Sequence, residues 1–232
     1  MDCRKNTDSS MVRDATVSRY SRGEEIANSI THGLGVVLAL GGLVVLIIFA
    51  ALYGNTWHIV SCSIFGAALI LLYLASTLYH AIQHPAAKSI LRILDHSAIL
   101  VLIAGTYTPF TLVSLRGPWG WTLFGIIWGL AVAGILIETT RLRRFRGWLI
   151  ALYVIMGWAV VAAIKPMMAN VSSGGLWLLL AGGLAYTGGI VFYLWKRLPY
   201  NHAIWHVFVL AGSALHYFAI LLYVIPVANG PG

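Results

Sequence analysis

The chain has 232 residues, of which 59% are apolar and only 9% charged, whereas soluble domains have roughly 45–50% apolar and 25% charged residues. The mean hydropathy of +0.84 excludes a soluble globular protein and indicates a chain that lies largely in a lipid bilayer. Lys and Arg number 15 against 7 Asp and Glu, a net charge of +8. In a soluble chain this excess would indicate a nucleic-acid partner, so the positions of the charges decide its meaning.

Two regions differ in composition. Residues 1–22 are polar with little to bury, and we expect a disordered cytoplasmic tail there. A helix needs about 20 apolar residues to cross a hydrocarbon core, and residues 23–227 contain seven apolar stretches of about this length. We therefore expect one all-α domain of seven transmembrane helices there. Short connections make successive helices antiparallel. Thr108-Pro109 predicts a kink in the third span. The expected spans, in chain order, are 33–53, 59–79, 93–115, 119–137, 148–164, 175–195 and 203–227.

The basic residues predict the orientation of these spans. Thirteen of the 15 Lys and Arg residues fall in the amino-terminal segment or in the second, fourth and sixth connections, and only Arg116 and Lys165 fall on the other side. Because Lys and Arg near span ends are retained in the cytoplasm, we expect the amino terminus inside and the carboxyl terminus outside. The excess charge then indicates contact with anionic lipid, with no nucleic-acid partner.

Four ionisable residues from three spans share one depth at the cytoplasmic side. His80 ends the second span, Asp95 starts the third, and His202 and His206 start the seventh. Ser76 lies one turn from His80 on the same helix face. Ionisable groups inside a membrane are costly, and they indicate a functional site.

The histidine spacing predicts a metal site. His202 and His206 are four residues apart, so their imidazoles differ by about 40° around a helix and lie one turn apart. With His80 they supply three neutral nitrogen ligands, the pattern of a catalytic Zn²⁺ site with a fourth position for water. Asp95 can hold the metal-bound water or orient a ligand. The competing interpretation is that each histidine only bonds a backbone carbonyl or reaches the interface.

Other polar residues near this depth have less specific roles. Glu25, Asn28 and His32 precede the first span, where they can cap the helix and bond across the bundle or form an outer shell around the metal; we favour structural support. We expect Glu138 to form a local ion pair beside the arginines at 141–146. The remaining histidines are expected in loops, on helix surfaces, in the core or at the interface: His58, His84, His96 and His216.

The sequence resembles the hemolysin III family, the bacterial branch of the progestin and adipoQ receptor superfamily, over about residues 22–226. The matching segments are Glu25-Ile-Ala-Asn-Ser-Ile-Thr-His32, Ser76-Thr-Leu-Tyr-His80, Leu94-Asp95-His96, Gly105-Thr-Tyr-Thr-Pro109 and His202-Ala-Ile-Trp-His206. The resemblance implies seven helices with the amino terminus inside, zinc held by the three histidines, and Asp95 with Ser76 beside the metal-bound water. It also implies kinship with membrane hydrolases of the ceramidase type.

We therefore expect a multi-pass protein of the inner or plasma membrane that hydrolyses a lipid amide or ester. A zinc-bound water would attack the carbonyl, Asp95 would take the proton, and Ser76 would bond the water or the carbonyl. The alternative is a non-enzymatic regulator of membrane homeostasis, or a receptor-like protein, with a structural zinc. An iron site formed by His202, His206 and Asp95 also stays open.

Overall fold

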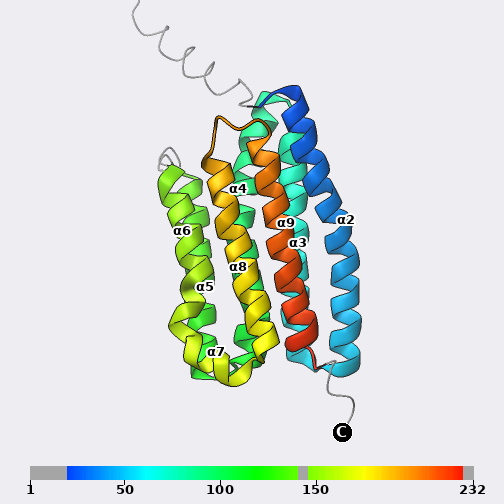
Figure 1. Cartoon of the computed structure of the whole chain (residues 1–232), viewed down its shortest axis with the longest axis vertical. Coiled ribbons are helices and arrows are strands. Elements are labelled where there is room, and N and C mark those ends of the chain that lie inside the picture. Colours follow the sequence, from blue (N-terminus) through cyan, green and yellow to red (C-terminus); the bar gives the residue numbers. More distant parts are fainter. Residues whose placement is uncertain (1–19, 141–145, 227–232) are drawn as a thin grey trace, which may run out of the picture.

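The structure is a computed structural model that describes residues 20–140 and 146–226, and within them every regular element is helical (Figure 1). Seven segments are long and apolar enough to cross a membrane, which confirms the seven-span, all-α prediction. They are α2 (Arg22–Tyr53), α3 (Thr56–Ala81), α4 (Pro85–Pro109) with η1 (Phe110–Ser114), α5 (Pro118–Glu138), α6 (Arg146–Trp158) with η3 (Ala159–Ala163) and α7 (Ile164–Asn170), α8 (Ser173–Leu194) and α9 (Asn201–Tyr223).

The first helix begins three turns before the expected apolar span. Ser21 caps α2, since its hydroxyl accepts from Glu24 N while Glu24 Oε2 accepts from Ser21 N at 2.8 Å. The helical stripe that α2 buries includes Glu25, Asn28 and His32, so these residues lie within the helix and point into the bundle. Most of the expected tail, residues 1–22, lies outside the described residues.

Two spans depart from a uniform α-helix. At Pro109, where we expected a kink, the chain stays helical and widens into the π-helix η1, because proline supplies no N–H to the preceding turn. The fifth span changes from α6 to the 3₁₀ segment η3 and returns to α-helix in α7.

One end of the bundle contains the start of α2, the α3–α4 connection and the α8–α9 connection (Figure 1). Tyr200, just before α9, has the left-handed φ of 56°, and its N–H donates to Glu24 Oε1 at 3.2 Å. Asn201 Nδ2 donates to the carbonyls of Phe192 and Tyr193 at the end of α8, at 3.0 and 3.1 Å. These bonds fix the first turn of α9, which holds His202, beside the first turn of α2.

Candidate metal centre

Three histidines from two helices meet at this end of the bundle. His80 lies in the last turn of α3, and His202 and His206 lie in the first two turns of α9. Each offers one ring nitrogen, and these nitrogens lie within 4.8 Å of one another. All three side chains are buried. The cluster predicted from the depth of the spans is therefore present in the fold.

Helix α2 orients two of the three imidazoles. His80 Nδ1 lies 2.6 Å from Glu25 Oε2, and because a carboxylate can only accept, the proton of this bond is on Nδ1. His206 Nδ1 lies 3.2 Å from the carbonyl oxygen of Asn28, which also requires the proton on Nδ1. In both rings the lone pair is thereby left on Nε2, the arrangement that outer-shell acceptors impose on metal-binding histidines.

The unpartnered nitrogens fit a metal ion. His80 Nε2 and both ring nitrogens of His202 are buried without a hydrogen-bond partner among the described residues. A buried polar atom left in this way costs about 1–3 kcal/mol, and coordination of a cation would supply the missing interaction. Three neutral imidazoles form the donor set that suits Zn²⁺ with one open position.

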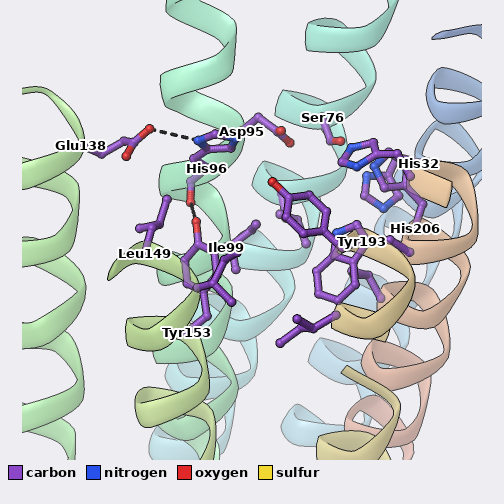
Figure 2. A pocket seen from close by; sticks show the side chains of 16 residues that line it. His32, Ser76, Asp95, His96, Ile99, Glu138, Leu149, Tyr153, Tyr193 and His206 are labelled. Carbon is purple, nitrogen blue, oxygen red and sulfur yellow. Dashed lines mark hydrogen bonds and ion pairs between the residues drawn. The ribbon is translucent and has the colours of Figure 1, made fainter. Parts of the chain in front are cut away.

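Asp95 and Ser76 line a pocket of about 70 Å³ together with His202 and His206. Both residues are buried, on α4 and α3 respectively. Figure 2 shows the Asp95 carboxylate and the Ser76 hydroxyl directed toward each other across this pocket. Ser76 Oγ has no hydrogen-bond partner within the described part of the chain. An acid and a hydroxyl thus share one small space with two of the three histidines.

Among the polar residues outside the cluster, His96 and Glu138 form a pair that the sequence did not predict. His96 is not simply a helix-surface residue: it lines the same pocket, and its Nδ1 lies 3.0 Å from Glu138 Oε1 (Figure 2). Glu138 therefore pairs with α4, while residues 141–145 lie outside the described chain. His216 Nε2 lies 3.2 Å from the carbonyl of Leu179, as expected for a core histidine. His58 and His84 occupy helix starts, in the N-terminal cap of α3 and as the N-cap of α4.

Glu25, Asn28 and His32, whose role the sequence left open, all contact the cluster. Glu25 and Asn28 make the contacts to His80 and His206 described above, and the His32 ring stacks on His206 with centroids 3.5 Å apart. Their spacing of three and four residues was the signal that one helix face carries them, and it continues through Gly35 and Ala39.

The fold and the cluster define a seven-span membrane protein with a buried three-histidine group near one end. The family model described as "Haemolysin-III related" matches residues 20–217. The chain is 52% identical over 206 residues to "Hemolysin-3" of Bacillus cereus, covering 89% of this chain and 94% of that protein. It is 53% identical over 204 residues to the "Hemolysin-3 homolog" of Bacillus subtilis (strain 168), covering 88% and 96%.

A more distant relative is the human "Monocyte to macrophage differentiation factor", which is 30% identical over 208 residues, covering 86% of this chain and 84% of that protein. The chain belongs to the haemolysin III family, which confirms the resemblance seen in the sequence. Together with the seven spans, this membership places it among multi-pass proteins of the bacterial plasma membrane.

Proposed function

We propose that this protein is a zinc-dependent hydrolase that cleaves an amide or ester bond of a membrane lipid. The observation that carries the proposal is the meeting of three histidine nitrogens within 4.8 Å beside a pocket that also holds Asp95 and Ser76. A bound zinc ion would activate water near neutral pH and polarise a carbonyl. His80, His202 and His206 would hold it.

Asp95 and Ser76 supply the groups that a hydrolysis needs besides the metal. The Asp95 carboxylate accepts a proton at Oδ from the water that attacks the substrate carbonyl, and it returns this proton to the leaving group. The Ser76 hydroxyl, without a partner in the described chain, donates to the substrate carbonyl or to the Asp95 carboxylate. Both side chains are buried, which keeps bulk water from this proton transfer.

The interior beyond the pocket supports a lipid as substrate. A second cavity, of about 110 Å³, shares Leu72, Ile99 and Tyr153 with the first. A third cavity, of about 400 Å³, shares Thr106 and Tyr107 with the second. It extends to Met167 and Ser173, near the other end of the bundle. Apolar side chains dominate these walls, so an acyl chain can lie along them while its carbonyl reaches the polar pocket.

Metal content and lipid composition test the proposal together. We expect purified wild-type protein to carry stoichiometric zinc, and the double variant His80→Ala, His202→Ala to carry none. An Asp95→Ala variant should keep the zinc, and its membranes should accumulate a lipid that the wild type consumes, seen by untargeted lipid analysis. Unchanged zinc in the double variant would exclude the site. Zinc retained with an unchanged lipid profile and cellular phenotype would favour the regulator with a structural metal.

A further inference from the structure

Lys88 has an unusual setting for a lysine near a helix start. It lies in the first turn of α4, where a positive charge meets the unfavourable end of the helix dipole. Its side chain is only 16% exposed, whereas lysines are almost never buried unless paired. Its position therefore requires specific acceptors.

Lys88 Nζ has three acceptors, which matches its three N–H donors. It donates to Glu25 Oε1 at 2.7 Å, to the carbonyl of Tyr79 at 3.1 Å and to Gln83 Oε1 at 3.1 Å. These acceptors come from the start of α2, the last turns of α3 and the α3–α4 connection. One ammonium group thus joins three segments around the end of α3.

Two of these acceptors also hold His80. Glu25 uses its other oxygen, Oε2, to accept from His80 Nδ1 at 2.6 Å. Gln83 uses its amide Nε2 to donate to the carbonyl of His80 at 2.6 Å. Asn28 Nδ2 also lies near His80 Nδ1, at the longer distance of 3.4 Å. Glu25 and Gln83, which hold the side chain and the backbone of His80, are both bonded to Lys88.

We propose that Lys88, Glu25 and Gln83 form a clamp that fixes the His80 imidazole with its Nε2 directed toward the other two histidines. The inference rests on the metal site proposed above and adds the positioning residues for one of its ligands. Lys88 balances the charge of the buried Glu25 carboxylate and sets its direction. Because outer-shell partners of metal ligands typically affect metal affinity 10- to 100-fold, the clamp should control zinc binding without touching the metal.

Zinc affinity, measured by competition with a chromophoric chelator on purified full-length protein, tests the clamp. We expect Glu25→Gln and Lys88→Met each to weaken zinc binding by about 10- to 100-fold. The double variant should be hardly weaker than the worse single variant, because both changes break one unit. Arg197→Gln, an exposed cation at the same end of the bundle, is the control and should bind zinc as the wild type does.

The tautomer of His80 gives a readout that does not need the metal. In metal-free, ¹⁵N-histidine-labelled wild type we expect the His80 proton fixed on Nδ1, and in Lys88→Met a mixture of both tautomers. Unchanged tautomer and unchanged zinc affinity in the Lys88 and Glu25 variants would overturn the clamp. A fixed tautomer that depends on Lys88, in a wild type that binds no zinc, would uphold the clamp and contradict the proposed function.

Discussion

Ser76 is the polar residue of the pocket whose contribution is easiest to isolate. Its hydroxyl lies on α3 one turn from His80, has no hydrogen-bond partner in the described chain and faces Asp95 (Figure 2). If it donates to the substrate carbonyl, Ser76→Ala should lower lipid turnover about 2- to 13-fold, since one neutral hydrogen bond contributes about 0.5–1.5 kcal/mol. If it donates to the Asp95 carboxylate, the decrease should be larger, because hydrogen bonds to charged groups are stronger. Zinc content should not change, because the hydroxyl is no metal ligand.

The matched control for Ser76 is Ser63→Ala on the same helix. The Ser63 hydroxyl donates to the carbonyl of Ile59 at 2.7 Å, a bond within its own helix, so turnover should equal that of the wild type. Equal turnover in both variants would remove Ser76 from the site, and loss of zinc in Ser76→Ala would assign it a structural role at the cluster.

The proximity of His80, His202 and His206 could be predicted because counting spans gives each residue a depth in the membrane. The residues of α2 could be predicted as candidates for structural support or for an outer shell around the metal, but the histidine that each of them contacts could not be predicted. Hydropathy placed the start of the first span at residue 33, since Glu25, Asn28 and His32 are polar, although they lie on the buried stripe of α2. Depth does not give the rotation of a helix about its axis, and that rotation brings Glu25 to His80 and His96 to Glu138.

At the scale of elements, helix α5 approaches the backbone of the π-helix η1 so closely at Gly120 that a side chain there would collide with it. A Cβ on Gly120 would lie 2.1 Å from the carbonyl oxygen of Thr111 and 2.5 Å from that of Leu115. Both atoms are backbone, so neither can rotate away. We expect Gly120→Ala to destabilise the protein by about 1–3 kcal/mol, seen as a lower melting temperature in detergent.

Gly125 on the same helix is the control, because a Cβ there would have nothing within 4 Å. Gly125→Ala should leave the melting temperature unchanged or raise it, since alanine favours a helix interior by roughly 0.5–1 kcal/mol over glycine. A Gly120→Ala protein as stable as Gly125→Ala would show that the backbone of η1 can shift to make room for the methyl group at little cost in stability.

The Thr108-Pro109 pair predicted a disturbance of the third span, which α4 and η1 form. Proline alone does not distinguish a kink from the π-turn that forms there.

For the whole molecule, the net charge of +8 bears on orientation in the membrane, because most of the Lys and Arg residues lie in connections that belong to one side of the bundle. The structure places the start of α2 and the α3–α4 and α8–α9 connections at one end, with the α4–α5 and α7–α8 connections at the other (Figure 1). The concentration of Lys and Arg at the first end leads us to expect that end, and the histidine cluster with it, on the cytoplasmic side.

Single cysteines, introduced into a background with Cys3→Ser and Cys62→Ser, test this orientation. Asn170 and Arg197 are both exposed and lie toward opposite ends of the bundle. A membrane-impermeant maleimide should label Asn170→Cys in intact spheroplasts and Arg197→Cys only after permeabilisation. Gly125→Cys, exposed on the apolar face of α5, should stay unlabelled in both. The reverse pattern would turn the pocket of Asp95 to the outside, so that a lipid carbonyl would have to reach it from the outer leaflet and the acyl chain would extend inward.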